Sequence, residues 1–241
     1  ALPLPGPVRR WALAAVRRAW RGRPGARTVQ SYLVADPLQR YADLAASSAF
    51  QEWERARVRG PRLREALRGW DLTEATFRPL LSGEQPGDWQ AQFQRLDLQV
   101  WLEGDPLAKV DRTTMAASLE ARVPFLDREV VELAAAMPPQ VMVRGRTAKW
   151  ALRQALRGLL PPETCSRPKH AFDPPVGAWL RGPLREQMAG LASHPFVRDA
   201  GYLDPRAVAC LAAEHLAGRR DRHRPLWALL VLARWWDLYG G

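Results

Sequence analysis

Apolar residues recur at helical spacing along almost the whole chain. Near the N-terminus, Val8, Trp11 and Ala15 follow one another at such intervals among arginines, which predicts an amphipathic helix over residues 7–23. A longer helix is predicted from Asp36 to Arg59, where Gly60-Pro61 interrupts the pattern. Shorter helices are expected over residues 63–70 and 72–81.

The second half of the chain continues this pattern. A helix is predicted over residues 106–121, and Pro124 then disfavours helical geometry at Val123. Asp127 is placed to cap the next helix, and Pro138-Pro139 to stop it. Further helices are expected at 147–160, after Pro183, at 205–218 and at 225–239. Because strand-like alternation is almost missing, the chain is predicted to be mainly α-helical.

Composition limits the class of protein. With 241 residues, 47% of them hydrophobic, the chain can bury a substantial core. Cys165 and Cys210 lack the spacing of a disulfide framework or a zinc site, so a cytoplasmic location is the simplest expectation. No apolar run reaches the roughly 20 residues that span a bilayer. The first residue is not Met, which suggests that the sequence begins within a longer protein.

Charge is unevenly distributed. The formal net charge is +11, but the N-terminal stretch is rich in arginine and contains no carboxylate before Asp36. This stretch is either a solvated helix face or the binding site of an anionic partner. Lysine occurs only as Lys109, Lys149 and Lys169. Since lysine is a compact charge that fits a tight oxyanion pocket, its confinement to this region points to a candidate site there.

Two charged clusters precede the last two lysines. Asp105 and Lys109 share a helix face, as either an exposed ion pair or part of a site. Glu120, Arg122 and Asp127 surround an apolar turn that is expected to be partly buried, so their charges need partners. Two interpretations remain open: Arg122 fixes the turn by binding one of the carboxylates, or the cluster contacts a ligand.

These clusters lie within a longer motif, residues 101–127, that is similar to the glutamine-hydrolysing asparagine synthetases. This family typically carries a lysine-x-aspartate-arginine step, here Lys109 to Arg112, and a glutamate-x-arginine-x-proline-x-leucine-aspartate turn, here Glu120 to Asp127. The resemblance continues through Lys149, Arg153 and the run Arg167-Pro168-Lys169. It is strongest over residues 96–182 and weak before 96, which separates a segment 1–95 from a segment 96–241.

Some family features differ or do not occur in this sequence. Ala171 replaces a glycine and Pro106 an aliphatic residue. The SGGxDS pyrophosphate loop, the acidic SG[DE]GxDE segment and the N-terminal cysteine of the glutaminase domain do not occur. The resemblance therefore implies the helical C-terminal portion of an α/β ATP-pyrophosphatase (PP-loop, adenine nucleotide alpha hydrolase-like) domain.

The function implied by the resemblance is that of an ATP-dependent amide ligase. Such an enzyme activates the side-chain carboxylate of aspartate, or another carboxylate, as an acyl-AMP and amidates it with glutamine-derived ammonia. ATP and Mg²⁺ are the implied cofactors, bound mainly by an upstream PP-loop segment, and a glutaminase segment is a further expected partner. The present chain alone is expected to be inactive and to expose apolar surface where those segments would pack.

Roles for individual residues follow from the same resemblance. Lys169 matches the essential lysine of the family and is the first catalytic candidate, and Asp105 is the second. The other candidates shape the substrate and ATP site, and none is a metal ligand: Lys109, Asp111, Glu120, Arg122, Asp127, Lys149, Arg153 and Arg167.

Other functions remain open at this stage. Within the same superfamily, the chain could belong to a β-lactam synthetase, a macrolactam cyclase or another amidotransferase. Outside it, a basic, tryptophan-rich helical module could bind an acidic partner or, less in keeping with the motifs, nucleic acid.

Overall fold

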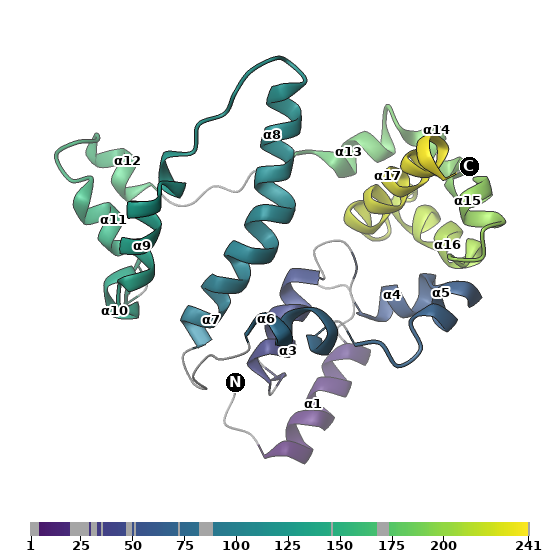
Figure 1. The fold of residues 1–241 in the computed structure, drawn as a ribbon. Helices are drawn as coiled ribbons and strands as arrows, with labels where there is room; N and C mark the ends of the chain where they lie inside the picture. The colour runs from purple at the N-terminus through teal and green to yellow at the C-terminus, as the bar shows by residue number, and fades with distance from the viewer. Residues whose placement is uncertain are drawn as a thin grey trace. The chain divides into compact units, whose positions relative to one another are not determined.

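The computed structural model describes residues 5–19, 29, 33–34, 36–46, 50, 52–71, 73–81, 89–145, 147–167 and 174–240. The chain divides into two compact units, one formed by Ala1–Ser82 with Pro174–Gly241 and the other by Gly83–Asp173. Both units are built mainly from helices (Figure 1), which confirms the predicted helical class. The predicted boundary between segments 1–95 and 96–241 was drawn where the family resemblance becomes strong, not from spatial contacts. It stays a prediction.

The first unit combines the two ends of the sequence. Its first part contains α1 (Gly6–Ala19), α3 (Pro37–Ala46), α4 (Glu52–Val58), α5 (Pro61–Ala66), the π-helix η1 (Thr73–Phe77) and α6 (Arg78–Leu80). Its second part contains α13 (Val176–Arg181), α14 (Arg185–Gly190), the 3-10 helix η4 (Leu191–Ser193), α15 (Pro195–Arg198), α16 (Pro205–Leu216) and α17 (His223–Tyr239).

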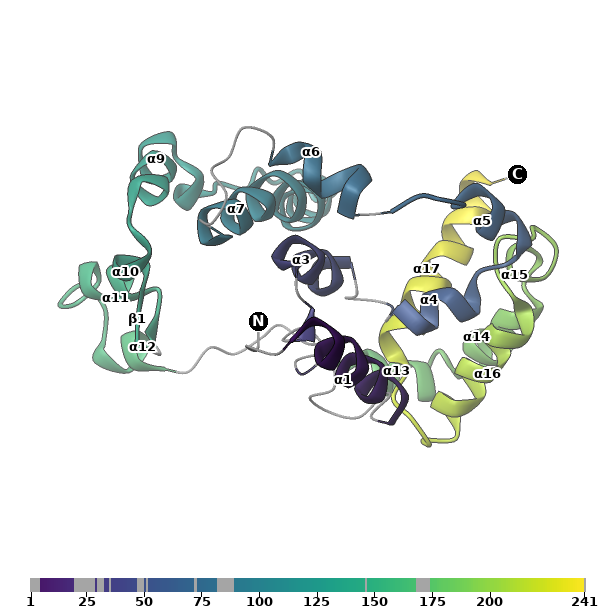
Figure 2. The ribbon, with the colours of Figure 1, turned by 90° about the horizontal axis from the view of Figure 1, so that it is seen from below.

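The core of this unit lies among α13 to α17. Leu180, Val208 and Leu226 are fully buried in it, and Val58 of α4 joins the same cluster. In Figure 2, α4 lies beside α16 and α17. Burial of apolar side chains from both parts of the sequence stabilises this arrangement, because removing apolar area from water is favourable.

Several predicted helix boundaries of this unit are confirmed. The backbone amides of Arg206 and Ala207 donate to the Asp204 carboxylate and cap α16. The helix predicted over 7–23 begins at Gly6 and its described part ends at Ala19. The single helix predicted from Asp36 to Arg59 was wrong: α3 and α4 are separate, and Phe50 between them is non-helical and packs against the core.

The junction between α4 and α5 depends on a glycine. The amide of Gly60 donates to the carbonyl oxygen of Tyr202 at 2.7 Å. A Cβ at this position would lie 2.4 Å from the carbonyl oxygen of Gly201. Only glycine therefore allows the backbone of residues 59–60 to approach residues 201–203 so closely.

A buried ionic network joins α4 to α16 and to the start of α17. The Arg222 guanidinium donates through Nη1 to Oε1 of Glu54 at 2.6 Å and through Nε to Oε2 of Glu214 at 2.8 Å. The side chains of Arg222 and Glu54 are only 4% and 5% exposed. Burying an unpaired charge costs free energy because the charge loses its hydration. The attraction between Arg222 and Glu54 offsets this cost for both groups.

His215 of α16 is the fully buried neighbour of this network. The backbone amide of Arg222 donates to its Nδ1 at 3.1 Å, and its Nε2 lies 3.3 Å from the carbonyl oxygen of Gly177. These contacts suit a neutral ring that accepts at Nδ1 and donates from Nε2. Burial lowers the pKa of His215, and the nearby positive charge of Arg181 lowers it further.

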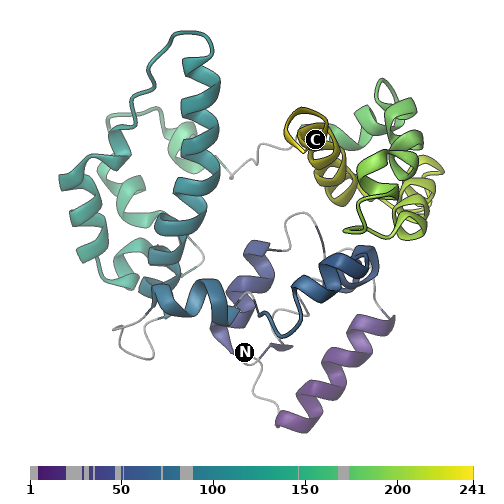
Figure 3. The ribbon, with the colours of Figure 1, turned by 45° about the vertical axis from the view of Figure 1, so that its right-hand side comes forward.

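The second unit begins with one long helical segment, in which α7 (Trp89–Leu96), the π-helix η2 (Asp97–Leu107) and α8 (Ala108–Met115) follow without a break (Figure 3). The 3-10 turn η3 (Pro124–Leu126), α9 (Arg128–Ala136) and α10 (Pro139–Met142) come next. The strands β1 (Val143–Arg144) and β2 (Thr147–Ala148) pair antiparallel, and α11 (Trp150–Ala155) and α12 (Pro162–Ser166) complete the unit.

Two sequence predictions need correction in this unit. The helix expected to reach residue 121 ends at Met115, because Ser118 adopts left-handed geometry (φ 57°). The amide of Leu119 then donates to the carbonyl of Thr114 and that of Ser118 to Met115, which is the Schellman arrangement. The helix expected over 147–160 is confined to α11, because residues 147–148 pair with β1 instead.

The second unit exposes much of its apolar surface. Beyond Leu96, none of its described residues through position 167 is buried. An apolar groove of about 530 Å³ lies between the long helical segment and η3, α9 and α10. Trp101 and Phe125 line it and are 55% and 67% exposed. The exposed apolar surface predicted from the sequence is therefore present, and such surface is typical of an interaction face.

Within the described ranges, no helix has both the length and the apolar character needed to cross a membrane.

Replacing Arg222 by methionine should strongly destabilise the first unit. Arg222→Met leaves the buried carboxylate of Glu54 and the half-buried carboxylate of Glu214 without their cation, and loss of one partner of a buried ion pair typically costs about 3–5 kcal/mol. Urea unfolding of the purified variant and wild type measures the difference. Arg198→Met, which removes only an exposed pair with Asp199, should leave the free energy of unfolding almost unchanged. Equal losses in the two variants would contradict a special role for Arg222.

Stability should also depend on the protonation of His215. The unfolded chain takes up this proton near the ordinary pKa of histidine, about 6.5, whereas the lowered pKa of the folded chain delays uptake to lower pH. The stabilising contribution is therefore complete above about pH 6.5 and declines as the pH falls below it. Unfolding followed between pH 5 and 8 should show this slope in the wild type and in His194→Asn, but not in His215→Gln. An unchanged slope in His215→Gln would refute the assignment.

Candidate functional site

The charged residues of the long helical segment form an exposed ion pair. The Nζ of Lys109 lies 2.8 Å from Oδ1 of Asp105, one helical turn away, and both side chains are largely exposed. Asp111 projects from another face of α8, because residues two positions apart do not share a helix face. Such an exposed pair contributes only a few tenths of a kcal/mol to stability, roughly, so it is available for binding without a structural penalty.

The predicted turn from Glu120 to Asp127 contains a second pair. Nη2 of Arg122 donates to Oε2 of Glu120 at 3.0 Å, while Asp127 instead caps α9 by accepting from the amide of Glu129 at 2.9 Å. The turn is exposed, and Phe125 at its centre is among the most exposed side chains. The expected burial was therefore wrong for this chain by itself, since no described residue covers the turn.

Lys149 has an unusual backbone conformation. It precedes the first residue of α11 with φ 56° and ψ 37°, in the left-handed region that residues with a Cβ seldom adopt. Backbone strain of this kind often occurs at functional sites. It turns the chain sharply from β2 into α11 and so brings Ala148 and Trp150 to the edge of one pocket.

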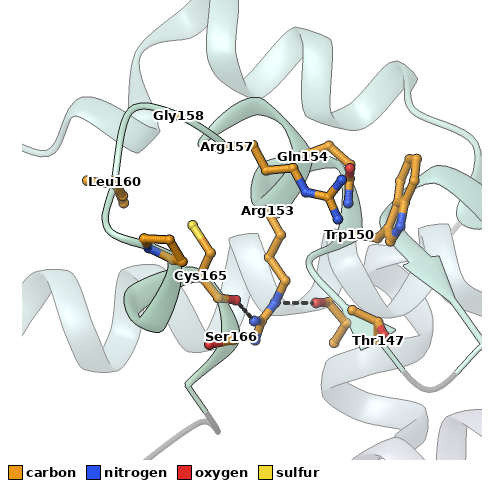
Figure 4. A pocket seen from close by; sticks show the side chains of 11 residues that line it. Thr147, Trp150, Arg153, Gln154, Arg157, Gly158, Leu160, Cys165 and Ser166 are labelled. Atoms are coloured by element: carbon orange, nitrogen blue, oxygen red, sulfur yellow. Dashed lines mark hydrogen bonds between the residues drawn. The ribbon is translucent and has the colours of Figure 1, made fainter.

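Arg153 holds that pocket together. Its Nε donates to the carbonyl oxygen of Ala148 at 3.3 Å, and its Nη1 donates to the carbonyl oxygen of Cys165 (Figure 4). One guanidinium thus bridges β2 and α12 from its place on α11. Because both acceptors are carbonyl groups, the positive charge of Arg153 is not neutralised by these bonds.

The pocket has a volume of about 750 Å³ and belongs entirely to the second unit. Of the predicted site residues, only Arg153 lines it, although Lys149 and Arg167 are sequence neighbours of lining residues. Asp105, Lys109, Asp111, Glu120, Arg122 and Asp127 do not line it. Lys169, the first catalytic candidate, lies outside the described residues, so its role stays a prediction.

Sequence reasoning missed several residues of the pocket. Arg157 lies four residues after Arg153, beyond the end of α11 at Ala155, and lines the same cavity, as do Thr147 and Ser166 (Figure 4). The spacing of the two arginines was a usable signal, because residues four apart share a face of the helix predicted over 147–160, although α11 itself ends at Ala155. The contributions of Thr147 and Ser166 had no such signal, since they come from different elements.

The described residues do not contain a group of three histidine, cysteine, aspartate or glutamate side chains arranged to hold a metal ion. Mg²⁺ and ATP were expected to bind mainly to another segment, and that expectation is not tested by these residues. Among the described residues that line the pocket, Arg153 and Arg157 carry positive charge.

Comparison with known proteins gives the class to which this helical chain belongs. The family model described as asparagine synthase matches residues 6–237. Since this range covers nearly all of the sequence, the chain belongs to the asparagine synthase family. No solved structure gives a significant match.

Similar individual proteins bear names of the same kind. The chain is 39% identical over 186 residues to a putative asparagine synthetase [glutamine-hydrolyzing] of Mycobacterium bovis and to one of Mycobacterium tuberculosis, covering 75% of this chain and 28% of the relative. Asparagine synthetase [glutamine-hydrolyzing] 1 of Bacillus subtilis is 33% identical over 144 residues, or 60% of this chain and 22% of that protein. The chain thus matches less than a third of the length of these relatives.

The left-handed geometry of Lys149 can be tested by substitution. Lys149→Gly should stabilise the chain against denaturant by about 0.5–1 kcal/mol, because glycine adopts positive φ without the steric cost of a Cβ. Lys149→Ala removes the same side chain but retains that cost, and it should not stabilise the chain. If both variants unfold at the same denaturant concentration, the backbone at Lys149 carries no strain.

Proposed function

We propose that this chain is part of an ATP-dependent amide ligase of the asparagine synthase type. In the proposed reaction, the aspartate side-chain carboxylate attacks the α-phosphate of ATP, pyrophosphate leaves, and glutamine-derived ammonia displaces AMP. The family match over residues 6–237 is the observation that carries the proposal. The names of the similar proteins favour aspartate over the carboxylates used by β-lactam synthetases and macrolactam cyclases.

The charged side chains of the second unit are proposed to serve the phosphate side of this reaction. Lys169 neutralises charge that builds up on the α-phosphate and on the leaving pyrophosphate, which is where fixed cations contribute most to catalysis. Asp105 is proposed to act near the substrate, and its exposed pairing with Lys109 leaves it accessible. Glu120, Arg122, Asp127 and Asp111 shape the site, while Lys149, Arg153 and Arg167 provide outer positive charge.

The remaining parts of the enzyme are proposed to lie outside this chain. A PP-loop segment would supply most ligands of ATP and Mg²⁺, and a glutaminase segment would supply ammonia. The exposed apolar groove and turn of the second unit support this proposal, because they offer a face on which another segment can pack. The proposal also implies that the chain alone does not turn over; aspartate-dependent release of pyrophosphate by the chain alone would contradict that part.

The function of Lys169 can be tested in the complete enzyme. Lys169→Ala should lower aspartate-dependent pyrophosphate release by roughly 10²–10³-fold or more, the loss typical of one preorganised electrostatic contact. Circular dichroism should show an unchanged fold. Lys169→Arg is the matched variant, because it keeps the charge but changes its shape.

Near-normal release by Lys169→Ala would exclude the proposed role of this lysine. Release of pyrophosphate with other carboxylates but not with aspartate would instead overturn the choice of substrate within the superfamily.

A further inference from the structure

The helix α1 carries positive charge and no negative charge. Four of its 14 residues are arginines, and the sequence contains no carboxylate before Asp36. Arg10 and Arg18 are exposed, and none of the carboxylates that the structure describes pairs with either one. Because these charges are not neutralised within the described chain, they are available to an anionic partner.

The exposed side of α1 also carries apolar side chains. Trp11 is 73% exposed, and Val8, three residues before it, is 48% exposed. Arg18 follows Trp11 by seven residues, or about two helical turns, so these three side chains lie on one face of the helix. Leu13 and Val16, on another side, are half-buried. The exposed face therefore combines apolar surface with positive charge.

The composition of α1 indicates which kind of anionic partner fits it. Apart from arginine, the helix contains only glycine, proline, valine, tryptophan, alanine and leucine. It thus lacks the serine, threonine, asparagine and glutamine side chains that proteins commonly use beside arginine to bind nucleic acid. Arginine together with tryptophan and aliphatic residues is typical of helices that lie in the interface of a lipid bilayer. There, the cations contact lipid phosphates and the apolar side chains enter the acyl boundary.

The length of α1 fits a location along a bilayer surface. Its 14 residues extend about 21 Å, which is less than the roughly 30 Å of the hydrocarbon core. Attachment to the surface requires no spanning segment. Tryptophan is enriched at the membrane interface, because its ring is apolar while its N–H is polar.

We infer that α1 binds the surface of an anionic phospholipid bilayer, with Arg10 and Arg18 on headgroup phosphates and Trp11 in the interface. Three further arginines follow within residues 21–27 of the sequence and add to the positive charge of this segment. The inference concerns the first unit and none of the charged residues assigned to amide formation. It holds whether or not the chain takes part in that reaction.

Sedimentation of the purified chain with lipid vesicles tests the inference. We expect vesicles of equal parts phosphatidylcholine and phosphatidylglycerol to bind the chain at least about tenfold more tightly than vesicles of phosphatidylcholine alone, because only the mixed vesicles carry net negative charge. A DNA duplex, added at an equal concentration of negative charge, is the competing anionic probe. It should not displace the chain from the mixed vesicles.

Matched substitutions locate the binding face. Replacing Arg10 and Arg18 together by glutamine should weaken binding to the mixed vesicles at least about tenfold. Replacing Arg64 and Arg185 by glutamine removes two exposed arginines of the same unit and the same net charge, and this control should bind as the wild type does. Trp11→Ala should also weaken binding, because it removes apolar surface from the interface. Circular dichroism verifies that all these variants fold.

The inference is overturned if the mixed vesicles do not bind the chain, if both kinds of vesicle bind it equally, or if the DNA duplex displaces it. Equal binding by the two double variants, or unchanged binding by Trp11→Ala, would overturn it as well. None of these results bears on the ligase proposal, which is tested by Lys169→Ala in the complete enzyme.

Discussion

The buried guanidinium of Arg222 holds together segments from opposite ends of the sequence. The carboxylates of Glu54 on α4 and Glu214 on α16 accept hydrogen bonds from this guanidinium. The backbone amide of Arg222 donates to Nδ1 of the neutral His215 ring. Since each charge would be costly to bury without its partners, the three side chains must assemble together. The apolar core of α13 to α17 includes Val58 of α4, so apolar contact and the ionic network join the same two parts of the sequence.

Among the residues that the structure describes, the second unit contains no comparable buried ionic centre. Its described side chains are bound mainly by exposed pairs, such as Asp105 with Lys109 and Glu120 with Arg122. The exception is Arg153, which uses backbone carbonyls of two elements and so positions the pocket walls without losing its charge. A unit with little buried core and a broad apolar face is suited to completing a site in a larger assembly, which agrees with the length of its relatives.

The sequence identified many local features of the candidate site. Helical spacing correctly placed Asp105 beside Lys109, and the cap at Asp127 was predictable because it depends on neighbouring residues alone. The choice of Arg122 between Glu120 and Asp127 required the geometry of the turn. The spacing of Arg153 and Arg157 gave a signal for one wall of the pocket, but the complete pocket was not predictable, because Arg153 bonds to carbonyl groups of two other elements, β2 and α12.

The sequence by itself determined the helical class, the caps at Asp127 and Asp204, and membership of a family recognisable from residues 101–127. These properties depend on residue type and short-range spacing, which the chain carries before it folds. Tertiary structure alone decided the break between α3 and α4, the early end of α8 and the ionic network of Arg222. Each of these features depends on contacts between residues distant in sequence or on local backbone geometry, such as the positive φ of Ser118. The spacing of apolar residues predicts neither distant contacts nor such backbone geometry.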